Sequence, residues 1–282
     1  MAHRATATAL LLLAAACAGE RRTAEPPSQP AAEPPVVTFT ATDFAFEGPD
    51  TIAPGFTTIR MENRGPQEHH LILARLDEGK TIDSLMAFFE ATPNTEPPFV
   101  TWRGAANSVL AGGTSGGTVD LPAGQYALLC FIPDRADGKP HLVKGMVRGL
   151  VVAGAPNGAA APVADAELRL KDLAFTHPPF TAGTHVIHII NDGPQLHEAQ
   201  LVRLAEGKTA QDFLATEVPG YKGEPAGTPL GGAGAFGVGL DGYWTVTLEP
   251  GNYLLVCFVP GPDGTPHLLQ GMMEEFSVPA AS

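Results

Sequence analysis

Charged residues and long apolar runs are both scarce in this sequence. Charged side chains make up only 17% of it, and 17 lysines and arginines against 30 acidic residues give a formal net charge of −13. The chain has no basic stripe that could meet phosphates, so we expect no nucleic-acid partner. Abundant glycine (32) and proline (27) favour short strands joined by turns over long helices.

The apolar run near the N-terminus is too short to span a bilayer. Arg4 precedes the run at 9–16, which ends in three alanines before Cys17. This arrangement predicts a cleaved export signal at 1–17 and no membrane helix. Small residues followed by cysteine resemble a bacterial lipobox, which implies that Cys17 carries a lipid; a plain secretory signal is the alternative. Residues 18–35, rich in Pro, Glu and Ala, are predicted to form a disordered tether.

The rest of the chain repeats itself. The shared motifs are Asn-x-Gly-Pro-Gln-x-His at 63–69 and 191–197, Cys-Phe-x-Pro at 130–133 and 257–260, and Gly-x-Pro-His-Leu at 138–142 and 264–268. They predict two homologous domains, 36–153 and 165–279, each of ordinary domain size. Residues 154–164 are mostly Ala, Gly and Pro and are predicted to be a linker.

Each repeat has a mostly β pattern. Short segments rich in β-branched and aromatic residues are bounded by Gly, Pro, Asn or Asp. The predicted strands cover 38–46, 57–62, 69–76, 125–132, 147–152 and 275–278. Apolar residues at helical spacing predict a short helix at 81–91, and Thr209 with Asp212 predicts a capping box for its counterpart. We therefore expect an all-β fold, a Greek-key sandwich or barrel, twice.

One His, one Cys, a second His and one Met occur in that order in each repeat. The two sets are His69, Cys130, His141 and Met146, and His197, Cys257, His267 and Met272. Two His and one Cys in a trigonal site with a weak axial Met are the blue-copper pattern, because thiolate and thioether hold Cu(I) while imidazole suits both oxidation states. The pattern predicts one copper ion per repeat. The alternative is a metal-free domain in which these Cys and Met residues fill the core.

The same residues resemble the copper site of the cupredoxin family. Asn63 to His69 resembles the strand with the family's first copper histidine, and 140–146 and 266–272 resemble its His-x4-Met segment. The resemblance covers 36–279 in two copies and implies two tandem cupredoxin-like domains, each with a short helical insertion. The long Cys-to-His loop resembles that of the type 1 site of copper nitrite reductases.

Two features depart from the family pattern. The position after the first histidine usually carries Asn, which ties neighbouring loops together, whereas His70 and Glu198 stand there in this chain. The Cys-to-His loop of the first repeat also contains the polar turn 134–138, which we expect to spread the ligands. His70 is an alternative first ligand, but His69 is preferred because it aligns with His197.

The remaining cysteines, histidines and tryptophans receive structural interpretations. Cys130 and Cys257 occupy equivalent positions, so a disulfide between them is not expected. His185 and His188 occur only in the second repeat and are interpreted as strand-surface residues. Trp102 and Trp244 do not align with each other, and core packing explains them.

The resemblance implies an extracytoplasmic electron-transfer protein, periplasmic or at the cell surface and tethered by its lipid alone. Its expected partner is a redox protein or a copper donor or acceptor. A copper carrier or store, and a copper-free interaction module, are the open alternatives. We expect no enzyme: Leu129 and Val256 stand where nitrite reductases have the histidine that leads to a second copper, and the His-x-His pairs of multicopper oxidases do not occur.

Overall fold

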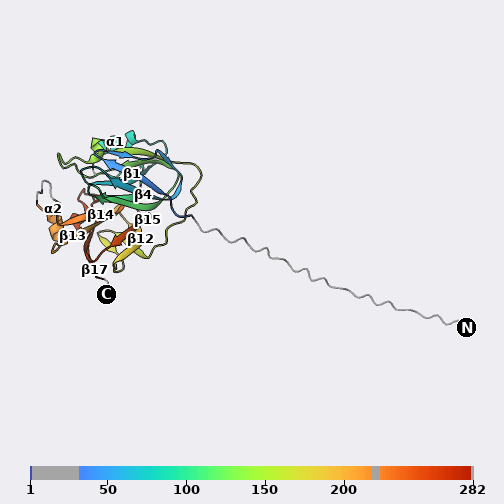
Figure 1. The fold of residues 1–282 in the computed structure, drawn as a ribbon. Helices are drawn as coiled ribbons and strands as arrows, with labels where there is room; N and C mark the ends of the chain where they lie inside the picture. Colours follow the sequence, from blue (N-terminus) through green and yellow to red (C-terminus); the bar gives the residue numbers. More distant parts are fainter. Residues whose placement is uncertain (2–31, 94, 218–220, 222, 281–282) are drawn as a thin grey trace. The chain divides into compact units, whose positions relative to one another are not determined.

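The computed structural model describes residue 1 and residues 32–93, 95–217, 221 and 223–280 (Figure 1). The predicted export signal, Cys17 and most of the predicted tether lie outside these residues. Residues 31–282 form one compact unit, and below we call 36–153 its first half and 165–279 its second half. No helix among the described residues has both the length and the apolar character needed to cross a membrane.

Both halves run through equivalent elements. The first half contains β1 (Val36–Thr42), β2 (Ala45–Glu47), β3 (Thr51–Ile52), β4 (Gly55–Asn63), β5 (His69–Leu76), α1 (Ile82–Ala91), β6 (Val100–Val109), β7 (Thr114–Leu121), β8 (Gly124–Leu129), the 3-10 helix η1 (His141–Lys144) and β9 (Val147–Val152). The second half contains β10 (Ala166–Lys171), β11 (Ala174–Thr176), β12 (Gly183–Gly193), β13 (His197–Leu204), α2 (Ala210–Thr216), β14 (Gly227–Phe236), β15 (Asp241–Leu248), β16 (Gly251–Val256), η2 (His267–Gln270) and β17 (Met273–Val278).

Two sheets pass through both halves. In Figure 1 the first half is coloured blue to green and the second half yellow to red. Their strand orders over the described residues are β11-β10-β12-β15-β7-β4-β1-β2 and β17-β16-β13-β14-β6-β5-β8-β9-β3. The halves meet where β6 pairs with β14 and β7 with β15. Each half is thus a sandwich with strands in both sheets, which confirms the predicted all-β, tandem cupredoxin-like fold class.

Local sequence signals placed several of these elements correctly. The predicted strands 69–76 and 147–152 coincide with β5 and β9. Thr81 and Thr209 are the N-caps of α1 and α2, and each takes part in a capping box. The single strand predicted at 38–46 is instead two strands, β1 and β2, which pair around a turn at residues 43–44. The polar Asp43 interrupts the β pattern there.

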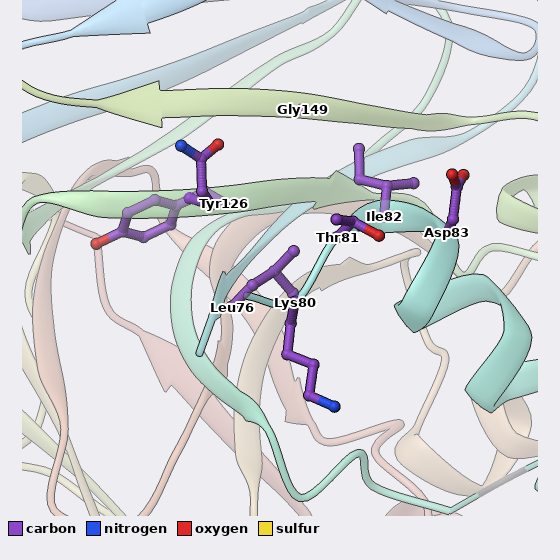
Figure 2. Close-up of a pocket in the computed structure, with 8 residues that line it drawn as sticks. Leu76, Lys80, Thr81, Ile82, Asp83, Tyr126 and Gly149 are labelled. Atoms are coloured by element: carbon purple, nitrogen blue, oxygen red, sulfur yellow. The ribbon is translucent and has the colours of Figure 1, made fainter. Parts of the chain in front are cut away.

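A pocket of about 320 Å³ lies where the start of α1 meets β8 and β9 (Figure 2). Lys80, Thr81 and Asp83 line it together with Tyr126. None of the predicted copper ligands borders this pocket. His69 and Cys130 lie at the opposite ends of strands β5 and β8.

Candidate metal centres

The four predicted ligands of the first half lie at strand ends or in the short segment between β8 and β9. His69 opens β5, Cys130 follows β8, His141 opens η1 and Met146 precedes β9. Because β8 pairs with both β5 and β9, the register brings these ends together. All four residues are fully buried, as are their four counterparts in the second half.

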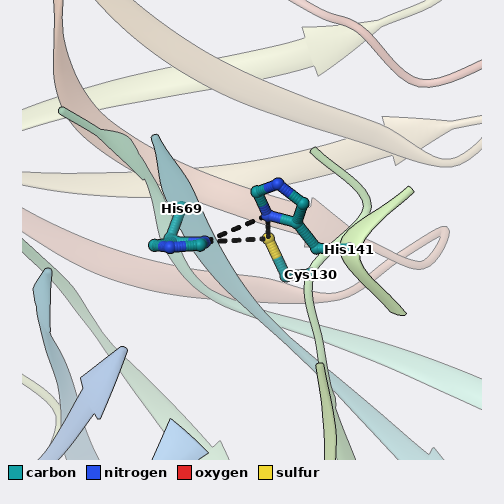
Figure 3. A group of neighbouring side chains, drawn as sticks. All are labelled: His69, Cys130 and His141. Atoms are coloured by element: carbon teal, nitrogen blue, oxygen red, sulfur yellow. Dashed lines mark hydrogen bonds between the residues drawn. The ribbon is translucent and has the colours of Figure 1, made fainter. Parts of the chain in front are cut away.

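Three side chains of the first half point toward one another (Figure 3). His69 Nδ1 lies 3.1 Å from His141 Nδ1 and 3.9 Å from Cys130 Sγ, and His141 Nδ1 lies 3.5 Å from the same sulfur. A point equidistant from the three atoms is about 2 Å from each, close to the lengths of metal–imidazole and metal–thiolate bonds. The group therefore fits a single metal ion.

The second half repeats the arrangement. The ligand atoms of His197, Cys257 and His267 all lie within 4.8 Å of one another. Cys257 Sγ is 3.5 Å from His267 Nδ1, and the two imidazole rings are 4.8 Å apart. His197 Nδ1 is buried and has no hydrogen-bond partner among the described residues. A buried nitrogen without a partner is costly, and a metal ion would satisfy it.

The methionines lie beside the cysteines. The Cys130 backbone N–H donates to the Met146 carbonyl at 3.3 Å, and Cys257 makes the same 3.3 Å bond to Met272. Both methionines are fully buried in the core. The backbone of each methionine is thus hydrogen-bonded to that of the cysteine in the adjoining His/Cys/His group.

Burial keeps the ligand sets neutral in the metal-free protein. It raises the pKa of the Cys130 thiol to about 12 and also raises that of Cys257. Burial, helped by the neighbouring His69, lowers the pKa of His141 to about 4. Two neutral imidazoles and a thiol carry no positive charge that would repel a cation, and a bound metal ion would displace the thiol proton.

A carboxylate holds the first histidine of each half. His69 Nε2 donates to Asp43 Oδ1 at 2.7 Å, and His197 Nε2 to Asp172 Oδ1 at 3.0 Å. Burial raises the pKa of Asp43, but hydrogen bonds from Gln67 and His69 outweigh it and lower the pKa overall. Sequence analysis missed both aspartates. The repeated Asp-x-Ala-Phe at 43–46 and 172–175 is the signal that could have found them.

The Asn-x-Gly-Pro-Gln-x-His motif builds the loop that leads to this histidine. Asn63 Nδ2 donates to the carbonyls of Gln67 at 2.8 Å and Val109 at 2.9 Å. The Gln67 side chain in turn donates to Asp43 Oδ2 at 2.8 Å. Asn191 and Gln195 make the equivalent bonds in the second half. The motif therefore holds Asp43 and Asp172 in place through Gln67 and Gln195, and each aspartate in turn orients its histidine.

His70 and Glu198, which stand where cupredoxins usually have Asn, each accept a hydrogen bond from the loop that follows the cysteine. The N–H of Phe131 donates to His70 Nε2 at 2.7 Å, and that of Phe258 donates to Glu198 Oε1 at 3.0 Å. Both donors directly follow a ligand cysteine. The structure thus places His69 in the ligand group and gives His70 a different role, as an anchor for the cysteine loop.

The polar turn of the first half does not spread the ligands as expected. The Asp134 N–H donates to the Lys139 carbonyl at 2.8 Å, and Lys144 forms an ion pair with the Asp134 carboxylate. Pro133 and Pro140 are bridged at the base of the turn. Because the turn closes on itself, the cysteine before it and the histidine after it remain close together.

The other singled-out residues lie in structural surroundings. His185 bonds to Asp165 and His188 to Asp241 on the surface of β12. Trp102 and Trp244 are buried in the core. Within the described part of the chain, Cys130 and Cys257 are both buried free thiols.

No protein-family model matches the sequence, and no curated protein matches it. Among solved structures, the chain is similar to the dithionite-reduced auracyanin of Roseiflexus castenholzii, with 21% identity over 44% of this chain and 100% of that one and a TM-score of 0.31. It is also similar to the copper-containing nitrite reductase of Thermus scotoductus (14% identity, 88% and 62% covered, TM-score 0.24). The blue copper oxidase of Nitrosomonas europaea is a third (15%, 87% and 86%, TM-score 0.26).

The last two proteins are enzymes, as are a laccase and further multicopper oxidases that the chain also matches. The expectation that the chain is not an enzyme is therefore contradicted, and we do not retain it. The absence of short histidine motifs does not exclude catalysis, because the ligands of a metal centre can lie far apart in the sequence. In its fold and in the composition of its two His/Cys/His groups, the chain is a tandem cupredoxin-like protein.

Proposed function

We propose that the chain binds one copper ion in each half and transfers electrons. The observation that carries this proposal is the buried convergence of two imidazole nitrogens and one thiol, repeated in both halves. A donor set of two His, one Cys and a neighbouring Met is the set that blue-copper sites use. A copper ion bound there supplies a one-electron couple between its +1 and +2 states.

The protein's own residues hold the donors and keep water out. The ligands are anchored at or near strand ends, and hydrogen bonds from the N–H groups of Phe131 and Phe258 to His70 and Glu198 hold the loops behind the cysteines. Donors fixed in this way move little when the charge of the metal changes, which favours rapid electron transfer.

Burial of the ligands favours electron transfer over copper carriage. A carrier passes its metal on by ligand exchange, which needs at least one accessible donor. All six His and Cys ligands are fully buried, so exchange requires the loops to open. We therefore prefer the electron carrier, with a redox protein as its partner, to the copper carrier or the metal-free module.

Copper reconstitution of the full chain tests the proposal. We expect two coppers per chain and an intense visible thiolate-to-copper band. The matched control is His185→Ala, which removes a histidine outside both centres. This variant should keep the parent's copper stoichiometry and visible band. Colourless uptake would favour carriage or storage, and no uptake would contradict copper binding altogether.

We also propose that the chain acts outside the cytoplasm, anchored by a lipid on Cys17. The support is the sequence pattern of the first 17 residues. Replacement of Cys17 by Ser should move the protein from the membrane fraction to the soluble fraction. Continued retention on membranes would contradict lipidation.

A further inference from the structure

We propose that Asp43 and Asp172 are positioning residues, which hold the first histidine of each centre with its proton on Nε2 and its Nδ1 lone pair directed at the metal site. We further propose that their negative charge favours the higher oxidation state of the bound metal. This inference deepens the proposed function and rests on it for its second part only.

The hydrogen bonds around Asp43 determine which ring nitrogen of His69 carries the proton. Gln67 donates to Oδ2 of the carboxylate at 2.8 Å, while Oδ1 lies 2.7 Å from His69 Nε2. A carboxylate only accepts hydrogen bonds, so Nε2 is the donor. A neutral imidazole then has its lone pair on Nδ1, the atom that faces Cys130 and His141.

The structure keeps room for this hydrogen bond. A Cβ atom on Gly65 would lie 2.7 Å from both Asp43 Oδ1 and His69 Nε2, closer than side chains tolerate. Glycine at this position therefore lets the loop pass directly over the pair. The aspartate itself stands in the turn between β1 and β2, whose strands are fixed by pairing in the sheet.

The second half repeats the same geometry. Asp172 lies in the turn between β10 and β11, accepts from His197 Nε2 at 3.0 Å and from Gln195 at 3.0 Å. The residues on either side of the aspartate differ between the halves, with Thr42 and Phe44 in one and Lys171 and Leu173 in the other. The Asp–His pair is thus retained although the residues directly flanking the aspartate have changed.

The charge of the aspartate is close enough to act on the metal. A carboxylate that accepts from a ligating histidine fixes the ring orientation and raises the basicity of the ligand. The side chains of Asp43 and Asp172 are 20% and 32% exposed, so solvent screens their carboxylates incompletely. A negative charge favours the more positive metal state, which predicts a lower reduction potential than a neutral residue would give.

The positioning role can be tested on the metal-free protein by ¹⁵N NMR of the histidine rings. We expect His69 to be protonated on Nε2 in the parent and in Asp43→Asn, whose side-chain oxygen still accepts. In Asp43→Ala the ring should populate both tautomers. The matched control is Asp77→Ala, which removes an exposed carboxylate of the same half. An unchanged His69 tautomer in Asp43→Ala would overturn the positioning role.

The charge effect is tested in chains that keep one centre. In a Cys257→Ala background, Asp43→Ala should weaken Cu(II) binding about 10- to 100-fold in competition with a chelator. Asp43→Asn, which keeps the hydrogen bond, should raise the reduction potential with a smaller loss of affinity. Values equal to those of Asp77→Asn would overturn the charge effect. If the Cys257→Ala parent takes up no copper, the proposed function fails, and the tautomer measurement alone decides the role of Asp43.

Discussion

Behind the ligands, the two halves place different residues in the same role. His70 in the first half and Glu198 in the second accept the N–H of the residue after the ligand cysteine. Burial is the main cause that lowers the pKa of His70, and the nearby His141 and His69 lower it further, to about 3. Burial raises the pKa of Glu198 to about 7. The fold therefore needs a hydrogen-bond acceptor at this position, and a neutral base or a carboxyl group can supply it.

The halves also differ where β6 meets β14. The Ser108 N–H donates to Gln200 Oε1 at 2.8 Å, and Asn107 Nδ2 donates to the Ala233 carbonyl at 3.0 Å. The residues equivalent to Asn107 and Ser108 in the second half are Gly234 and Ala235, and Ile72 is equivalent to Gln200. One side of the junction is thus polar and the other apolar. Among the described residues, the polar side adds side-chain hydrogen bonds between the halves to the backbone pairing of β6 with β14.

The largest expected effect comes from removing one centre at a time. Cys130→Ala and Cys257→Ala should each abolish one copper and about half of the thiolate-to-copper band, because the thiolate is the ligand that produces the band. The double variant should be colourless. Metal analysis and visible spectroscopy measure both values. Full colour in either single variant would show that the halves do not each hold a thiolate-bound copper.

Opposite pH dependences should follow from His70 and Glu198. The pKa of His70 is lower in the folded protein than its ordinary 6.5, so its contribution to stability is present above pH 6.5 and is lost as the pH falls toward 3. The pKa of Glu198 is higher than its ordinary 4.5, so its contribution is present below pH 4.5 and is lost as the pH rises toward 7. The loss for Glu198 is roughly 3 kcal/mol when complete.

Replacing His70 or Glu198 by Gln keeps a hydrogen-bond acceptor but removes the ionisable group. Urea unfolding of the metal-free protein across this pH range should show that His70→Gln removes the acid-side loss and that Glu198→Gln removes the loss between pH 4.5 and 7. Identical pH profiles for the two variants would contradict the difference between the halves. Asp77→Asn is the control for the removal of an unrelated carboxylate.

Local sequence signals determined much of the fold and the ligand sets. Strand β5 is a run of eight residues that begins at His69, the helical spacing of apolar residues predicts α1, and the Thr209 and Asp212 capping box marks the start of α2. The His, Cys, His and Met order was visible because it occurs twice. Such features depend on neighbours in the sequence, so they can be predicted without knowledge of the tertiary structure.

Features that depend on distant contacts were not predicted. Strand β14 was not predicted because it is rich in Gly and Ala, and in β6 a central Arg-Gly-Ala-Ala-Asn segment interrupts the β pattern; such residues have weak strand propensity. They are strands because the halves approach closely there: a Cβ atom on Gly104 would lie 2.3 Å from the Phe236 ring. Asp43 was missed for the same reason, since its partner His69 lies 26 residues further along the chain.

The polar side of the junction should contribute more to stability than the apolar side. Gln200→Leu removes one acceptor of the buried Ser108 N–H and the donor to the buried Gly231 carbonyl, and we expect a loss of about 1–3 kcal/mol in the free energy of unfolding. The matched change on the apolar side, Ile72→Val, should cost about 1 kcal/mol. Urea unfolding of the metal-free protein measures both values. An equal or smaller loss for Gln200→Leu would show that the polar contacts do not hold the halves together.

The smallest expected effect comes from His188, one of the two histidines found only on β12 of the second half. Its ring stacks on Tyr243 at 4.5 Å and bonds to the partly exposed Asp241 at 2.6 Å. Exposed polar contacts of this kind contribute little, so His188→Ala should lower the free energy of unfolding by about 1 kcal/mol or less. Copper stoichiometry should stay at its parent value, because the side chain lies outside both ligand groups. A lost copper in this variant would mean that the second half uses a histidine that the first half lacks, and the two centres would then no longer be equivalent in their ligands.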